Sequence, residues 1–335
     1  MKRDNYVPES LVEAVRYFTD PDNAHAFMAQ LRWPTGVVCP HCAMLGNESK
    51  DVSFYANRRV WRCQTCKKQF SVKVGTIFED SPLTLDKWLV GMWLIANAKN
   101  GISSHEIARA LGITQKSAWF LDHRIRLAMK MGSIEKSKMQ GTVEADETFI
   151  GGKASNMHKS KKAEKIQGRG SSGKEIVMGL LQRFEDETGL LKTGSSEVRV
   201  KHIPDTSGET LQGEVRANVE AGSEVFTDAA PAYRGLSPEY YHEFVDHAVS
   251  YAEGRVSTNG LENFWSLFDR CLMGTWTHVD PYHLFRYLDE QAFRFNARKL
   301  TDADRFLLVT GAVSGKRLTY KELIGKVNHE QETQE

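Results

Sequence analysis

Three acidic residues in the second half of the chain have the chemistry and setting to bind divalent metal. Asp146 lies within residues 143–149, where apolar and polar side chains alternate with the period of a strand. Strands disfavour Asp, and burying an unpaired carboxylate is costly, so a bound cation would offset its charge. Asp228 ends the short apolar strand predicted at residues 225–228. Glu262 lies in the first turn of a predicted helix.

Four of the five cysteines form two Cys-x2-Cys pairs that are 20 residues apart, and they are Cys39, Cys42, Cys63 and Cys66. Two such pairs can place four thiolates around one structural zinc ion, as in a zinc ribbon. Strand-like segments at 52–55, 59–62 and 69–73 fit that module. Two disulfides are the alternative, and a chain without a secretory signal disfavours them. Cys271 lies in an apolar setting and is expected to be a buried thiol.

Residues 84–130 have the pattern of three helices with a turn at Gly112. A helix, a short glycine turn and a helix with a polar, basic start are typical of a helix-turn-helix. In that layout the residues expected to face DNA are Gln115, Lys116, Ser117, His123 and Arg124. A plain helical bundle that binds nothing is the alternative.

Charge is unevenly distributed along the 335 residues, although the net charge is only +1. Residues 1–140 carry 20 Lys and Arg against 13 Asp and Glu, whereas the remainder carries 24 against 30. A basic first half suits a polyanion and an acidic second half suits bound metal, unless the charges vary by chance. The start of the chain lacks a signal-peptide pattern, and the most apolar stretch, residues 88–98, is too short to span a bilayer. We therefore expect a soluble, cytoplasmic protein.

The second half has a regular order of predicted elements. After the Asp146 strand, residues 154–174 are basic and rich in Gly and Ser; Lys161 and Lys162 either follow DNA phosphates or lie on a solvated loop. Strands are predicted at 175–182 and 197–203, a helix at 208–221, then the Asp228 strand. The last strand, at 243–247, precedes the helix of Glu262.

This order resembles the ribonuclease-H-like fold, in which the first and fourth strands are neighbours. The chain is similar to bacterial insertion-sequence transposases of the DDE class, in the branch with an N-terminal zinc ribbon. The matching motifs, besides the cysteine pairs, are VEADETFIGGK at 143–153, FTDAAPAY at 226–233, TNGLENFWS at 258–266, GTWTH at 274–278, HLFRYLDE at 283–290 and RFNAR at 294–298.

The resemblance implies a multidomain α+β protein of four parts. They are a helix and zinc ribbon at 1–80, a helix-turn-helix at 81–140, a ribonuclease-H-like α/β domain with a mixed five-stranded sheet at 141–300, and a C-terminal tail at 301–335. It also implies that Asp146, Asp228 and Glu262 hold two Mg²⁺ or Mn²⁺ ions for DNA cleavage and strand transfer. The implied partners are the terminal inverted repeats and target DNA, bound by a homodimer or larger oligomer associated with the nucleoid.

The chain departs from this family at one position of the same helix. Family members usually carry Lys seven residues after the third acid, and this chain has Asp269 there. Arg270 could take over from about 100° around the helix. Otherwise the chain is a catalytically impaired, DNA-binding descendant; a ribonuclease-H-like nuclease is a further alternative. Glu253 and Asp269 compete with Glu262 as the third acid, and His247 and His278 are either structural or in contact with DNA.

Overall fold

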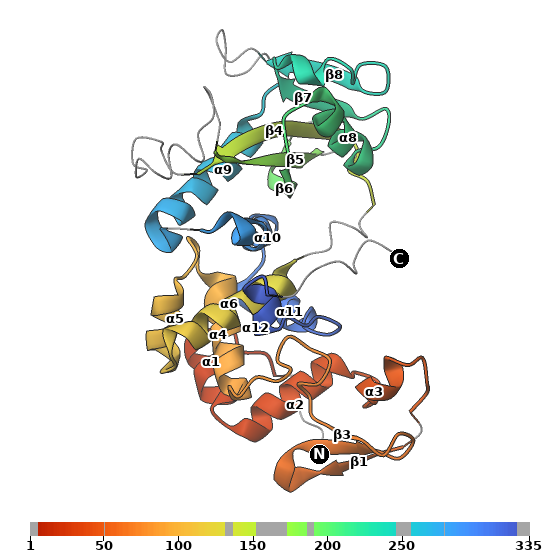
Figure 1. Cartoon of the computed structure of the whole chain (residues 1–335), viewed down its shortest axis with the longest axis vertical. Coiled ribbons are helices and arrows are strands. Elements are labelled where there is room, and N and C mark those ends of the chain that lie inside the picture. The colour runs from red at the N-terminus through yellow and green to blue at the C-terminus, as the bar shows by residue number, and fades with distance from the viewer. Residues whose placement is uncertain are drawn as a thin grey trace. The chain divides into compact units, whose positions relative to one another are not determined.

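The computed structural model describes residues 6–49, 51–130, 137–151, 173–185, 191–245, 256–277 and 279–326. The chain forms two compact units, one of Met1–Lys130 with Leu300–Glu335 and one of Met131–Lys299 (Figure 1). The four-part division expected from the sequence remains a prediction. Within the described part of the chain, no helix combines the length and the apolar character needed to cross a membrane.

The first unit contains a small antiparallel sheet beside the cysteine pairs. Its strands are β1 (Val52–Tyr55), β2 (Val60–Cys63) and β3 (Gln69–Phe70), in that order, and the short helix α3 (Pro40–Ala43) carries the first pair. The third strand is shorter than predicted, because the chain turns at Ser71, whose carbonyl accepts a hydrogen bond from the Val74 amide.

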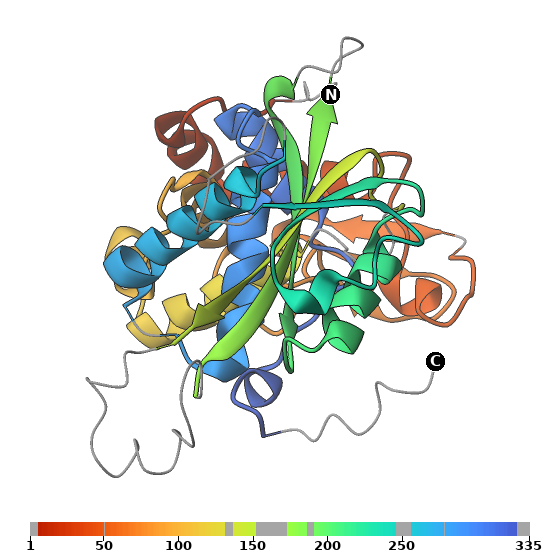
Figure 2. The same ribbon diagram turned by 90° about the horizontal axis from the view of Figure 1, so that it is seen from above.

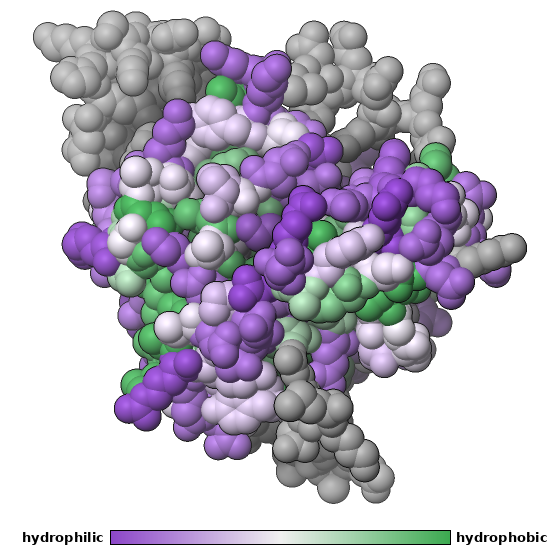
Figure 3. All heavy atoms as spheres, turned by 90° about the horizontal axis from the view of Figure 1, so that it is seen from below, coloured by the Kyte–Doolittle hydropathy of each residue, from purple (hydrophilic) through white to green (hydrophobic). Residues whose placement is uncertain are grey.

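The surface of this small sheet and the cysteine-bearing segments beside it, residues 39–70 (the ribbon), mixes apolar and hydrophilic side chains. Trp61 is buried and stacks on His25, whereas Met44, Leu45 and Phe54 are exposed. Figure 3, which views the molecule from the side of β1 and β3, likewise shows apolar patches within a hydrophilic surface. Apart from the cysteines, Trp61 and Phe70 are the buried hydrophobic residues among those described between positions 39 and 70, so this core is small, as expected for a module that gains folding energy from metal.

The remainder of the first unit is helical. Its helices are α1 (Leu11–Phe18), α2 (Pro21–Arg32), α4 (Leu85–Asn97), α5 (Ser104–Leu111), α6 (Gln115–Met129), α11 (Asp302–Gly311) and α12 (Tyr320–Leu323). A capping box between Ser103 and Glu106 starts α5. Gly112, with φ of 60°, ends α5 in the left-handed conformation that glycine adopts without strain.

Residues after Leu300 complete the core of this unit. The ring of Phe306, on α11, lies within 6 Å of the rings of Phe18, Phe27 and Trp93. The Ile77 amide also donates a hydrogen bond to the Val313 carbonyl. The segment expected to be a tail thus contains two helices and part of the core.

The second unit is built on a mixed sheet of five strands in the order β6-β5-β4-β7-β8. They are β4 (Thr142–Ile150), β5 (Glu175–Glu185), β6 (Leu191–Ile203), β7 (Glu224–Asp228) and β8 (Tyr241–Val245). The pairs β4–β5 and β5–β6 are antiparallel, whereas β4–β7 and β7–β8 are parallel. The predicted mixed five-stranded sheet is confirmed, with its first and fourth strands adjacent.

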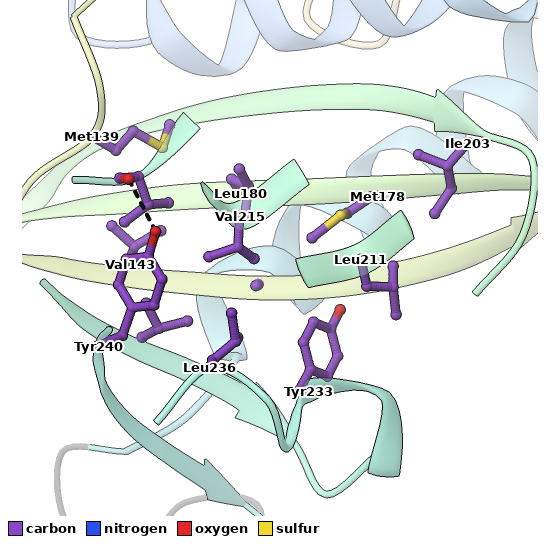
Figure 4. Close-up of a cluster of buried hydrophobic side chains, with 13 residues drawn as sticks. Met139, Val143, Met178, Leu180, Ile203, Leu211, Val215, Tyr233, Leu236 and Tyr240 are labelled. Atoms are coloured by element: carbon purple, nitrogen blue, oxygen red, sulfur yellow. Dashed lines mark hydrogen bonds between the residues drawn. The ribbon is translucent and has the colours of Figure 1, made fainter. Parts of the chain in front are cut away.

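Helices cover both faces of this sheet. Helix α8 (Gly208–Asn218) lies on one face, and α9 (Asn259–Cys271) and α10 (Leu284–Asn296) lie on the other (Figure 2). Figure 4 shows the core under α8, where Leu211 and Val215 meet Val143 and Leu180 of the sheet. Successive residues of a strand point to opposite faces of the sheet. Leu180 therefore packs beneath α8, whereas its neighbour Leu181 packs in the core beneath α9.

Several element boundaries differ from the sequence prediction. Strand β5 runs on to Glu185 and β6 begins at Leu191, so both are longer than predicted. Helix α8 ends three residues early, because Val219 takes an extended conformation and bridges to Met139. Strand β8 begins at Tyr241, two residues before the predicted start, because it pairs with β7 from that residue on. Residues 246 and 247 lie outside the described part of the chain.

Candidate active site and zinc site

Two carboxylates lie side by side on neighbouring strands of the second unit. The parallel pairing of β4 and β7 ends at Glu144 and Phe226, and Asp146 and Asp228 each follow two residues later on their strands. The charge of Asp228 is near enough to act on Asp146. The indole of Trp265, on α9, donates a hydrogen bond of 3.0 Å to Asp146 Oδ2. Asp146 therefore points to the face of the sheet that α9 covers.

Helix α9 carries the third acid, Glu262, in its first turn, where the side chain is exposed. Among the described residues, the four cysteines are the only group of three or more placed to hold a metal ion, so the three acids do not form one tight cluster. Three carboxylates are hard oxygen donors, which suit Mg²⁺ or Mn²⁺. Two ions about 4 Å apart with their own waters need ligands spread more widely than one ion does.

The sheet carboxylates repel one another. The pKa of Asp146 rises to about 7, first because the group is buried and then because Glu147 and Asp228 lie nearby. Burial also raises the pKa of Glu147, against a 2.7 Å hydrogen bond that its Oε2 accepts from the Tyr233 hydroxyl. Sequence reasoning passed over Glu147, although it adjoins Asp146. A cation at this edge of the sheet would relieve the repulsion.

Sequence reasoning also missed Glu144, which is 1% exposed. Its Oε2 accepts a 2.9 Å hydrogen bond from the Leu261 amide, and its Oε1 lies 2.6 Å from Arg183 Nε. Thr258, the residue before α9, makes no side-chain capping bond. The cap comes instead from the sheet. The alternation of acids at 144 and 146 was the available signal, since both belong to one strand face.

The remaining charges of α9 lie further along the helix. Asp269 and Arg270 are exposed, and Arg270 Nε donates to the Ser266 carbonyl. Partial burial raises the pKa of Asp269. Asp269 lies about two turns from Glu262, roughly 10 Å along the axis at 1.5 Å per residue. The two acids therefore cannot bind one metal cluster directly.

The four cysteines of the ribbon have the geometry of a tetrahedral site. All their Sγ atoms lie within 4.8 Å of one another, and the Cys39–Cys66 and Cys42–Cys63 pairs are each 3.7 Å apart. A tetrahedron with Zn–S bonds of about 2.3 Å has edges of about 3.8 Å. The four thiols act on one another: the backbone amides of Cys66 and Thr65 lower the pKa of Cys63 to about 6, whereas burial raises the pKa of Cys39 and Cys42. This arrangement is consistent with structural zinc.

The alternative of two disulfides is excluded, because all five cysteines are free. Cys271 is buried, as predicted, and its thiol lies 3.5 Å from Gln291 Oε1. Burial raises its pKa.

The residues predicted to face DNA on α6 divide into two groups. Gln115 and Lys116 are exposed at the start of the helix, and the Lys116 ammonium lies 4.7 Å from the centre of the Tyr320 ring. Ser117 is partly exposed and its hydroxyl lies 2.9 Å from that of Thr114.

The prediction that Arg124 faces DNA is wrong. Arg124 is 4% exposed, and its guanidinium donates to the carbonyls of Leu318, Ile77 and Glu79. His123 is buried as well. Neither side chain can reach a phosphate without opening the core of this unit. The other residues that the sequence singled out lie outside the described part of the chain, and they are Lys161, Lys162, His247, Glu253 and His278.

Comparison with known proteins bears on both sites. Residues 138–296 match the ISXO2-like transposase domain, and residues 19–69 match the transposase zinc-ribbon domain. Together the two matches cover more than half of the chain. The chain therefore carries an ISXO2-like transposase domain behind a transposase zinc-ribbon domain. It is also 24% identical, over 272 residues, to an uncharacterized protein in transposable element ISH50 of Halobacterium salinarum, a match that covers 77% of this chain and 85% of that protein.

The two domains account for most of the candidate residues. The three acids Asp146, Asp228 and Glu262 all fall within the transposase domain, and the four cysteines fall within the zinc-ribbon domain. Gln115 and Lys116, on α6, lie between the two matched segments. The transposase assignment is therefore supported by the two matched segments. A DNA-binding role for α6 is supported only by the exposed polar residues at its start.

Proposed function

We propose that this transposase binds the terminal inverted repeats of an insertion sequence and carries out metal-dependent cleavage and strand transfer of that DNA. Asp146, Asp228 and Glu262 are the proposed metal-binding and catalytic residues. The observation that supports the proposal is the parallel pairing of β4 and β7, the two strands that carry Asp146 and Asp228, together with the hydrogen bond from Trp265 of α9 to Asp146.

The strand order supports a ribonuclease-H-like assignment of the second unit. Three antiparallel strands, then a helix and two parallel strands, bring the first and fourth strands of the unit together. The acid on the fourth strand stands at its carboxyl end, where ligands of such sheets commonly bind. The acid on the following helix then completes the site from one face of the sheet.

Bound Mg²⁺ or Mn²⁺ ions would activate water or a 3′-hydroxyl and stabilise the leaving oxygen of the phosphodiester. The chain supplies the ligands and their directions. Asp146 and Asp228 are fixed by the sheet, and the Trp265 indole holds one oxygen of Asp146 in place. Glu262 extends from a helix that begins against the sheet, so its reach is set by the first turn of α9.

The first unit is the proposed DNA-binding part. The exposed Gln115 and Lys116 at the start of α6 follow α5 and a glycine turn, which is the order of a helix-turn-helix. The ribbon adds exposed basic residues, including Arg62 and Lys67. We further propose that two or more copies act together on the paired ends of one element.

The test begins with selection of bound DNA from a random pool, which identifies the sequence that the protein reads. A labelled duplex ending in that sequence is then incubated with Mg²⁺ and target DNA. Glu262→Gln should keep its fold and DNA affinity yet lose cleavage, because the amide lacks the charge that holds the metal. Asp269→Asn is the matched control on the same helix and should cleave.

Three outcomes contradict this assignment. Normal cleavage by Glu262→Gln together with inactive Asp269→Asn would move the third acid to position 269. Cleavage without joining would identify a nuclease instead. Sequence-specific binding without any cleavage would indicate a DNA-binding descendant that has lost activity.

A further inference from the structure

We propose that Glu144 and Arg183 are positioning residues that fix the direction of Glu262 by holding the start of α9 against the sheet. This inference rests on the proposed function, because it assigns a role toward the third catalytic acid. Neither residue is one of the three proposed metal ligands. Their contacts show a built, buried junction between β4, β5 and the segment that enters α9.

The first contact is the cap. The first amides of a helix have no partner within the helix, so a carboxylate placed there is bonded and favoured by the helix dipole. Glu144 Oε2 accepts from the Leu261 amide at 2.9 Å, one residue before Glu262. The carboxylate that caps α9 therefore belongs to the central strand of the sheet, not to the loop before the helix.

The second contact fixes the chain just before the helix. Arg183 Nη2 donates to the carbonyl and to the hydroxyl of Ser257, at 2.6 and 2.8 Å, while its Nε donates to Glu144. The side chains of the ion pair are only 8% and 2% exposed. One guanidinium from β5 thus holds both the capping carboxylate and the residue at which the chain approaches α9.

The third contact is a close approach that only glycine permits. A Cβ placed on Gly260 would lie 2.7 Å from Glu144 Oε1 and 3.0 Å from Oε2. The helix can therefore sit on the carboxylate because residue 260 has no side chain. One turn further, Trp265 bonds to Asp146, so the first two turns of α9 are fixed to the same strand at two points.

The position of the Glu144–Arg183 ion pair explains how it would affect the proposed metal site. Glu262 directly follows the bonded Leu261 amide, so a change in the angle of the first turn moves its carboxylate relative to Asp146 and Asp228. Groups that orient metal ligands typically change metal affinity or activity by 10- to 100-fold when altered. A purely structural ion pair of equal burial should not do so.

The experiment compares two buried ion pairs of the second unit in the full-length, zinc-loaded chain. Glu144→Gln keeps an oxygen for the Leu261 amide but loses the charge that holds Arg183. Glu290→Gln is the control, since Glu290 pairs with Arg294 on α10, with side chains 0% and 7% exposed. The measurement is DNA cleavage as a function of Mn²⁺ concentration, alongside thermal unfolding.

Both variants should unfold at lower temperature than the wild type. Only Glu144→Gln should raise the Mn²⁺ concentration for half-maximal cleavage, by about tenfold or more, with the rate largely recovered at saturating Mn²⁺. Ser257→Ala, which removes one acceptor of Arg183, should shift the requirement in the same direction by a smaller factor. It serves as the readout if Glu144→Gln does not fold.

The inference would be overturned if Glu144→Gln and Glu290→Gln needed the same Mn²⁺ concentration for half-maximal cleavage. It would also be overturned if Glu144→Gln needed the same concentration as the wild type. If the wild type cleaves no DNA, the proposed function fails on its own. Calorimetric titration of the full chain with Mn²⁺ then decides the inference. Binding that is at least tenfold weaker in Glu144→Gln alone supports positioning, and equal binding refutes it.

Discussion

Replacing Asp146 by Asn is expected to stabilise the metal-free protein at neutral and alkaline pH. The pKa of Asp146 rises from its ordinary 3.8 to about 7, chiefly through burial and then through Glu147 and Asp228. Each pKa unit corresponds to about 1.4 kcal/mol, so ionising this carboxyl in the folded state costs about 4 kcal/mol at most. Asn removes that cost and can still accept the Trp265 hydrogen bond.

The sign of the pH dependence follows from proton uptake. Below pH 3.8 the carboxyl is protonated in both the folded and unfolded states, so it contributes no difference. Between about 4 and 7 the unfolded state releases the proton first, so the free energy of unfolding falls as the pH rises. Above pH 7 the free energy of unfolding falls no further on account of Asp146. The Asn variant lacks this decrease.

The assay is hydrogen exchange in urea, read by mass spectrometry on peptides from residues 137–151, with a chelator present. The free energy of unfolding of Asp146→Asn should exceed that of the wild type by up to about 4 kcal/mol at pH 8. The two values should be equal near pH 4. Mn²⁺ should reverse the order, because only the wild type keeps the ligand. A variant that is no more stable than the wild type at pH 8 without metal would refute the reasoning.

Three further predictions concern other parts of the chain. Cys63→Ser should lower bound zinc from about one ion per chain to none by elemental analysis, and should increase hydrogen exchange in residues 39–70 alone. Lys116→Ala should weaken DNA binding and reduce the dependence of DNA affinity on salt concentration. An unchanged salt dependence would indicate that α6 belongs to a helical bundle that does not bind DNA. Gly179→Ala should lower the free energy of unfolding by about 1–3 kcal/mol, measured in urea, because its Cβ would lie 2.7 Å from the ring of Trp265.

Much of the local architecture could be predicted from the sequence. The alternation around Asp146, the turn at Gly112 and the paired cysteines each arise from residues close together in the chain. The adjacency of the Asp146 and Asp228 strands followed from the order of elements and the family resemblance. Such features depend on short-range periodicity and spacing, which the sequence displays directly.

The features that were missed depend on partners far apart in the chain. The Glu144 carboxylate caps an amide 117 residues away, so its role as a cap could not be read from local pattern. Arg124 was assigned to a DNA-facing surface by analogy with a helix-turn-helix, yet a carbonyl 194 residues later accepts from it. Glu147 was overlooked because metal binding was assigned to its neighbour Asp146. Long-range hydrogen bonds decided all these cases.

The return of the chain to the first unit has a consequence for how the protein is made. Helices α1, α2 and α4 leave the ribosome early, but the aromatic cluster of Phe18, Phe27 and Trp93 is closed by Phe306, which is synthesised only after the whole second unit. The second unit can fold while the first still exposes part of its core. A nascent chain interrupted before α11 would thus carry the three proposed catalytic acids beside a first unit whose core is unfinished.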